Sequence, residues 1–165
     1  MSDAPVPAVQ IRRAKPPDQL IVAEFNSRLA LETENKLLDA SVLNRGVALA
    51  LSEPDRLCYW LAEVADSADA IGQAAISREW SDWRNGWIWW LQSVYVLESH
   101  RGRGVFRALF RAIRDEARGE RDVIGIRLYV EDSNEPALRT YRALGLRPGG
   151  YSVYQELWEE RFVQQ

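Results

Sequence analysis

The stretch SHRGRGVFRAL, residues 99–109, constrains the fold of this chain more than any other. It joins an apolar run, WIWWLQSVYVL at 87–97, to a run with apolar residues at every fourth position, namely Val105, Leu109, Ile113 and Ala117. That spacing predicts an amphipathic helix, whereas the run before it is apolar on both faces, as in a central strand covered on both sides. The sequence therefore predicts a strand, a glycine-containing turn and a helix in direct succession.

The remaining patterns predict one mixed sheet with helices on its faces. Short alternating or apolar runs indicate strands, and longer runs with helical spacing indicate helices. The expected strands are 8–14, 56–66, 70–80, 87–97, 123–130 and 151–158. The expected helices are 17–36, 37–53, 105–117 and 135–144. The order is thus β-α-α-β-β-β-α-β-α-β, an α/β chain of the α+β mixed-sheet type with a parallel crossover through the third helix.

Length and composition predict a single domain over residues 1–165, with residues 1–8 flexible. The chain lacks a long apolar run and a secretion signal, so we expect a cytoplasmic protein without a membrane partner. Its single cysteine suits a reducing compartment. One histidine and one cysteine do not make a zinc site, so no metal is expected. A net charge of −3 argues against nucleic acid as a partner.

Two glycines in the turn, Gly102 and Gly104, let the backbone point successive N–H groups at one place in front of the next helix. Such a place suits a phosphate or pyrophosphate, and Arg101 and Arg103 add mobile positive charge around it. The same residues also fit an ordinary turn at a helix start. The spacing of a P-loop is absent, and a dinucleotide fingerprint would need a third glycine at Arg107.

The stretch VYVLESHRGRGVF resembles the acyl-CoA signature of the GNAT superfamily of N-acetyltransferases, [QR]-x-x-G-x-[GA] after a strand. The residues that match are Arg101, Gly102, Arg103 and Gly104. Phe106 departs from the pattern, because the family usually has Gly or Ala there. A second stretch, NEPALRTYRALGL, resembles the family's later motif, in which Asn134 opens a helix and Tyr141 follows seven residues on. The element order agrees with the family's from about residue 9 to residue 158.

The resemblance implies a GNAT-like acyl-CoA N-acyltransferase fold and transfer of an acetyl group from acetyl-CoA to a primary amine by direct attack. It assigns the pyrophosphate to the backbone of the glycine turn and the thioester carbonyl to main-chain groups of the preceding strand. The residues expected to bind acetyl-CoA are Val94, Tyr95, Val96, Arg101, Gly102, Arg103, Gly104, Val105, Phe106 and Asn134. Asn134 would cap its helix in any case. Tyr141 is the expected general acid, because a phenol remains protonated at neutral pH; a core tyrosine is the alternative.

The general base is expected at Glu79. Many family members carry Glu where this chain has Gln92, and an amide does not accept a proton. If Asn85 and Gly86 form a two-residue hairpin loop, Glu79 lies directly opposite Gln92 and on the same face. A water relay, or a Glu79 that only faces solvent or pairs with an arginine, are the alternatives.

The acceptor is expected to be a small cationic amine. The stretch EWSDWRNGWIWW sets carboxylates among tryptophans, which suits ion pairing and cation–π attraction. The expected substrate-binding residues are Glu32, Glu34, Trp83 and Trp90. Aromatic packing on a sheet face or in a homodimer would also explain the tryptophans. A CoA-binding regulatory or interaction module without turnover is the competing function, supported by Gln92 and Phe106.

Overall fold

A computed structural model describes residues 8–158 and shows two compact units, one ending at Leu128 and the other beginning at Tyr129. The strands of the first unit are β1 (Val9–Arg13), β2 (Cys58–Val64), β3 (Ala70–Ser81), β4 (Gly86–Val96) and β5 (Val123–Leu128). Its helices are α1 (Gln19–Glu34), α2 (Ala40–Ser52) and α3 (Val105–Gly119), with short 3-10 turns η1 (Pro16–Asp18) and η2 (Glu98–His100). The second unit contains α4 (Glu135–Ala143).

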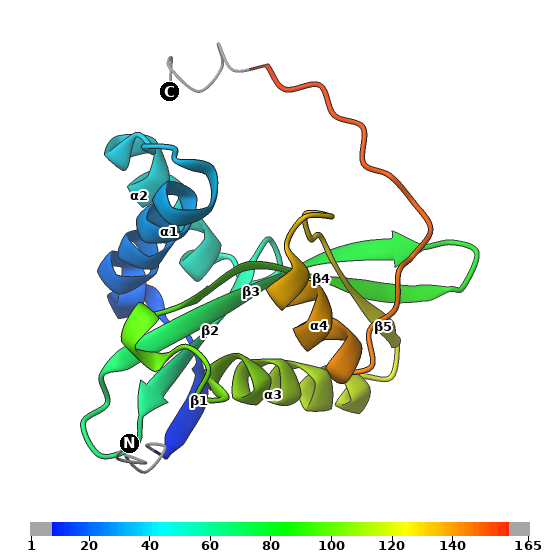
Figure 1. Cartoon of the computed structure of the whole chain (residues 1–165). Helices are drawn as coiled ribbons and strands as arrows, with labels where there is room; N and C mark the ends of the chain where they lie inside the picture. The colour runs from blue at the N-terminus through cyan, green and yellow to red at the C-terminus, as the bar shows by residue number, and fades with distance from the viewer. Residues whose placement is uncertain (1–7, 159–165) are drawn as a thin grey trace. The chain divides into compact units, whose positions relative to one another are not determined.

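The five strands lie in one sheet in the order β1-β2-β3-β4-β5. Neighbouring strands are antiparallel except β4 and β5, which are parallel and joined through α3. This agrees with the predicted crossover. Figure 1 shows α1 and α2 together on one side of the sheet and α3 on the other.

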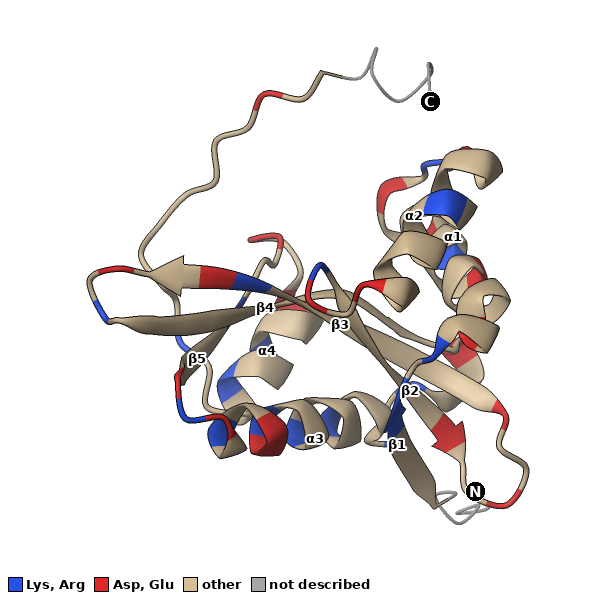
Figure 2. Cartoon of the chain, turned by 180° about the vertical axis from the view of Figure 1, so that it is seen from behind, with Lys and Arg blue, Asp and Glu red and all other residues tan. Residues whose placement is uncertain are grey.

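Alternation along β2 explains the two layers, because successive side chains of a strand point to opposite faces. Tyr59 and Leu61 belong to the apolar core formed with α1 and α2. Trp60, between them, points to the other face, where its Nε1 donates to Glu116 of α3 at 3.2 Å. The arginines of α3, blue on the ribbon in Figure 2, include exposed ones at Arg107, Arg111 and Arg118, as expected of the outer face of an amphipathic helix.

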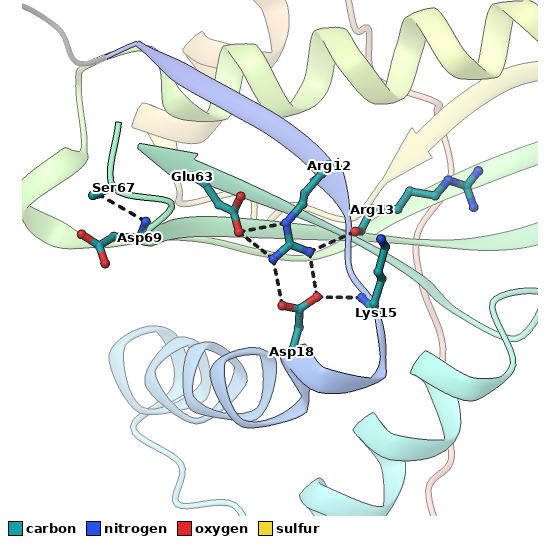
Figure 3. A network of polar contacts seen from close by, with 7 residues as sticks. All are labelled: Arg12, Arg13, Lys15, Asp18, Glu63, Ser67 and Asp69. Atoms are coloured by element: carbon teal, nitrogen blue, oxygen red, sulfur yellow. Dashed lines mark hydrogen bonds and ion pairs between the residues drawn. The ribbon is translucent and has the colours of Figure 1, made fainter. Parts of the chain in front are cut away.

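A charged cluster ties the start of the sheet to the first helical turn (Figure 3). Arg12 of β1 donates to both carboxylate oxygens of Asp18 at 2.7 and 2.8 Å, and to Glu63 of β2 at 2.6 and 2.9 Å. The main-chain N–H of Lys15 also donates to Asp18 at 2.7 Å. These bonds from Arg12 and Lys15 hold the pKa of the Asp18 carboxyl below its usual value. The cluster joins β1 and the η1 turn that follows it to β2, which lies much further along the sequence.

The last predicted strand, 151–158, is absent: the structure gives these residues no regular secondary structure. Tyr151, Val153 and Tyr154 are exposed. A strand requires a hydrogen-bonded neighbour, and the apolar content of this stretch says nothing of whether one is present. The segment predicted to be flexible is 1–8, and its residues 1–7 lie outside the described residues. The expectation of a single domain over residues 1–165 stays a prediction.

The register of the β3–β4 hairpin also differs from the prediction. Ser81 pairs with Gly86, so the loop has four residues, Asp82–Asn85, and Glu79 lies opposite Ile88. Asn85 has a positive φ of 50°, as a turn residue can, but Gly86 does not. Gly86 is instead required by close approach: a Cβ there would lie 2.5 Å from Ile124 and 2.8 Å from the carbonyl oxygen of Asp122. The Asn-Gly pair therefore marks a packing contact and not a two-residue turn.

Candidate functional site

The glycine turn has the conformation that its sequence predicts. Gly102 and Gly104 have φ of +72° and +82°, in the left-handed region that favours glycine. A Cβ at either position would meet nothing within 4 Å, so neither glycine is packed against another segment of the described chain. Gly104 is the N-cap of α3 and has no side chain to satisfy the helix's first N–H groups. The turn thus offers backbone donors and the positive end of a helix to an approaching anion.

Arg101 is held in place, contrary to the mobile charge that we expect from the sequence. Its guanidinium forms an ion pair with Glu32 at the end of α1 and donates to the carbonyl oxygen of Val96 at 2.9 Å. It also lies 5.5 Å from the ring centre of Tyr95. The Glu32 carboxylate therefore already pairs with the Arg101 guanidinium in the absence of a ligand. Arg103, in contrast, is exposed.

Glu32 is the centre of this contact. The hydroxyl of Tyr95 donates to it at 2.7 Å, in addition to the ion pair with Arg101. The Arg101 and Tyr95 bonds lower the pKa of Glu32, while burial and the Glu32 bond raise the pKa of Tyr95. The negative charge of Glu32 is therefore compensated within the chain, which weakens the case for Glu32 as a residue that binds a cationic acceptor.

The sheet opens beside the glycine turn. The last paired residues of β4 and β5 are Leu91 and Leu128, and β4 continues to Val96 paired only with β3. Within that extension Ala75 pairs with Gln92 but Gln73 pairs with Tyr95, so β4 carries one residue more than β3. This is a β-bulge, which bends a strand and turns its main-chain groups away from the ladder.

Ser93 makes the bulge. Its φ is +51°, a conformation that costs a non-glycine residue roughly 1–3 kcal/mol and persists only where its surroundings enforce it. The main-chain groups of Val94 to Val96, predicted to face the thioester, come directly after it. They lie on the part of β4 that extends beyond β5.

A buried polar network lies under the bulge, and the sequence analysis missed it. Gln73, fully buried in β3, donates to Asn26 of α1 at 2.8 Å and to the carbonyl oxygen of Ser93 at 3.3 Å. Asn26 donates to the hydroxyl of Tyr59 of β2 at 3.1 Å. A glutamine in an otherwise apolar strand, AIGQAAI, is the one signal that points to it.

Glu79 does not lie where the predicted base should be. With the four-residue loop, the partner of Gln92 is Ala75, and Glu79 is four residues further along β3. That separation corresponds to about 13 Å along a strand. The prediction that Glu79 faces Gln92 is wrong because the register follows the loop length, which the Asn-Gly signal does not fix.

The cation that we expect beside Glu79 and Trp90 is supplied by the protein itself. Trp90 Nε1 donates to Glu79 at 2.5 Å, and Arg127 of β5 donates to the other Glu79 oxygen at 3.1 Å. The Arg127 guanidinium is also 5.8 Å from the Trp90 ring centre. The predicted pairing of a carboxylate and a tryptophan face with a cation is present, but the cation is Arg127 of the same chain and not an acceptor amine.

The structure does not gather the four predicted acceptor residues. Glu32 and Glu34 lie in the last turn of α1, and Glu34 is exposed. Trp90 is within β4, and Trp83 is in the hairpin loop with 87% of its surface exposed. No role in binding follows for Trp83 from its position.

The second unit confirms the local structure of the second motif. Asn134 caps α4, its Oδ1 accepting from the N–H of Ala137 at 3.2 Å, and Gly145 just past the helix has a φ of +90°. Tyr141 lies in the last turns of α4, and burial raises its pKa above the usual value for a phenol. The phenol is therefore fully protonated at neutral pH.

Two features are absent from residues 8–158. None of their helices combines the length and apolarity needed to cross a membrane. Nor do three or more His, Cys, Asp or Glu side chains come together among them in a way that would hold a metal ion.

Comparisons with known proteins agree with this arrangement. Over 90% of this chain and 97% of the other, the protein is 38% identical to the solved structure of a possible acetyltransferase from Clostridium difficile 630, with a TM-score of 0.83. A predicted acetyltransferase from Clostridium acetobutylicum, solved with acetyl-CoA, shares the fold at 20% identity, with a TM-score of 0.73 over 92% and 98% of the two chains.

A curated relative is more distant. The chain is 27% identical over 103 residues to the streptothricin acetyltransferase of Escherichia coli, a match that covers 62% of this chain and 54% of the relative. This chain thus spans about half the length of that relative. Residues 16–146 match the model of the acetyltransferase (GNAT) family. With its mixed five-strand sheet and its glycine turn between β4 and α3, the chain belongs to the acetyltransferase (GNAT) family.

Proposed function

We propose that this chain transfers the acetyl group of acetyl-CoA to a primary amine of a small cationic molecule. The observation that carries the proposal is the glycine turn itself, in which Gly102 and Gly104 have positive φ between the bulged end of β4 and the start of α3. We treat residues 1–165 as one catalytic domain acting in the cytoplasm, where its single cysteine would stay reduced. The reaction by direct attack needs no metal.

The glycine turn fits the pyrophosphate of the acetyl donor. Its positive φ values aim backbone N–H groups outward, and no side chain at Gly102 or Gly104 blocks an approach. The backbone from Arg101 to Phe106 would hold the pyrophosphate, and the Phe106 side chain does not remove backbone donors. Because Arg101 is paired with Glu32, the exposed Arg103 is the side chain that would add charge. The relative solved with acetyl-CoA supports this choice of donor.

The open end of β4 would receive the thioester. Main-chain groups of Val94 to Val96 would polarise its carbonyl, as donors aimed at a developing oxyanion do. The neutral amine attacks the carbonyl carbon, a C–N bond forms and the C–S bond breaks. The thiolate takes up a proton and the nitrogen loses one, so charge and protons balance.

Tyr141 would donate the proton to the thiolate. Burial raises its pKa, which keeps the proton on the phenol at neutral pH. Glu79 is hydrogen-bonded to Trp90 and Arg127 and is not opposite Gln92, so we assign the amine proton to a water relay. Asn134 caps α4 and would touch acetyl-CoA only in addition to that task.

A cationic acceptor is supported by the exposed carboxylate of Glu34 at the end of α1 and by the name of the Escherichia coli relative. Streptothricin therefore belongs in the first panel of amines, together with an aminoglycoside, a polyamine and free lysine. Acetylation is measured by mass spectrometry of the product and by release of the CoA thiol.

The Tyr141→Phe variant tests the reaction. We expect kcat to fall about a hundredfold or more, as for loss of a general acid, while the Kd for acetyl-CoA stays the same. Tyr154→Phe is the matched control, since Tyr154 is 95% exposed and has no assigned role. An unchanged kcat in Tyr141→Phe would remove Tyr141 as the acid. Binding of acetyl-CoA without acetylation of any amine would favour the CoA-binding module over the enzyme.

A further inference from the structure

We propose that Gln73, Asn26 and Tyr59 are positioning residues for the acetyl-transfer step, because they hold the bulge of β4 in the conformation that aims its main-chain groups at the thioester. The inference rests on the proposed function, and it names residues that no motif in the chain identifies. None of the three would touch the donor or the acceptor. Each would act through Ser93.

The bulge needs support because Ser93 has a φ of +51°. A serine does not favour that conformation by itself, and β5 does not continue alongside this part of β4. A strand with one paired edge and one strained residue can relax towards a regular ladder. Relaxation by one residue would reverse the directions of the main-chain groups that follow.

The network holds Ser93 through its carbonyl oxygen. Gln73 Nε2 donates to the Ser93 carbonyl oxygen at 3.3 Å. Asn26 fixes the Gln73 amide in turn, accepting from Gln73 at 2.8 Å and donating to the Tyr59 hydroxyl at 3.1 Å. The network therefore ties the bulge to three separate elements, α1, β2 and β3.

The composition of the surroundings argues that the network is not there for stability. Tyr59 lies in an apolar core with Phe25, Leu61 and Ala75, where an aliphatic residue in place of Gln73 would pack without polar cost. Gln73 Oε1 is buried and has no partner among the described residues, a further cost that a core glutamine brings. Its Nε2, in contrast, donates hydrogen bonds to Asn26 and to the Ser93 carbonyl oxygen. Positioning of the bulge explains why a glutamine is kept at this place despite its unpaired Oε1, and why its Nε2 contacts Ser93.

The closing experiment compares the wild type with Gln73→Met and Tyr59→Phe. The carbonyl stretch of bound acetyl-CoA is measured by difference infrared spectroscopy with a ¹³C-labelled acetyl group, which needs no acceptor. We expect the wild type to move this stretch to lower wavenumber than in free acetyl-CoA. In the variants the move should be at least halved, kcat should fall about tenfold or more, and the calorimetric Kd for acetyl-CoA should change by less than about threefold.

Asp18→Asn is the control for a loss of stability without a role at the bulge, since Asp18 bonds Arg12 and Lys15 at the other end of the sheet. It should lower the unfolding temperature and leave the carbonyl stretch at its wild-type position. Tyr59→Phe keeps the buried ring, so it answers the question even if Gln73→Met does not fold.

The outcomes separate the two proposals. Wild-type stretch and wild-type kcat in both variants would overturn the positioning role and leave acetyl transfer untouched. A wild type that binds acetyl-CoA without moving the stretch would also overturn the positioning role, because the bulge would then not polarise the thioester carbonyl. Failure of the wild type to bind acetyl-CoA would overturn the proposed function, and the positioning role with it.

Discussion

At the scale of single residues, Asp18 shows how one carboxylate can make stability depend on pH. Its pKa is lowered mainly by the Arg12 guanidinium, and the side chain is largely buried. A carboxyl whose pKa is lower in the folded than in the unfolded chain adds stability above the unfolded value, which is about 4. That stability is lost as the pH falls through the folded pKa.

We therefore expect Asp18→Asn to lower the stability at pH 7 by about 1–2 kcal/mol, or the unfolding temperature by about 2–8 °C. The difference between wild type and variant should shrink as the pH falls below about 4, because the unfolded wild type then takes up a proton, and it should vanish once the folded carboxyl is protonated as well. Thermal unfolding at a series of pH values measures this. Asp55→Asn is the control, because Asp55 pairs with Arg78 while remaining 93% exposed, and such pairs contribute little. A constant difference from pH 7 to pH 3 would contradict the account.

Residues of the site divide into those that a local rule predicts and those that it does not. Gly102, Gly104 and Asn134 have the φ values or the cap that their motifs require, since these depend on neighbours in sequence. The pairing of Arg101 with Glu32, and of Glu79 with Arg127, depends on which distant segments the fold brings together. Charge alone does not select a partner at that distance in sequence.

At the scale of elements, the predicted strands 8–14 to 123–130 and all four helices are confirmed with ends that shift by a few residues. Hydrophobic periodicity reports element type, because it reflects which side chains face a core. It does not report pairing. The register of the β3–β4 hairpin and the absence of a strand at 151–158 are both matters of pairing, and both differ from the prediction.

The contact between β4 and the start of β5 offers a test at this scale. Gly86→Ala should lower stability by about 1–3 kcal/mol, because its Cβ would lie 2.8 Å from the Asp122 carbonyl oxygen and 2.5 Å from Ile124. Gly46→Ala in α2 is the matched control: its Cβ meets nothing within 4 Å, so it should raise stability by about 0.5–1 kcal/mol. Chemical denaturation measures both. A Gly86→Ala protein as stable as wild type would contradict the close approach of Gly86 to Asp122 and Ile124.

At the scale of the whole molecule, two signature motifs in the expected order predicted the family, and the family match and the mixed sheet confirm it. Motifs suffice to predict the family because the glycine turn and the strand before it are neighbours in sequence and together form the β4–α3 junction of the fold. The acceptor is a different matter. Its recognition depends on side chains such as Glu34 and on surfaces that no motif in the chain specifies.

The central claim is that the turn between β4 and α3 holds the pyrophosphate of acetyl-CoA. Thermal unfolding with and without acetyl-CoA tests it most directly, with acetyl-pantetheine, which carries the thioester but no pyrophosphate, as the matched ligand. At about 100 times Kd, acetyl-CoA should add about 2.7 kcal/mol and raise the unfolding temperature by about 5–10 °C, while acetyl-pantetheine should shift it far less. An unfolding temperature unmoved by millimolar acetyl-CoA, or moved equally by both ligands, would contradict the claim.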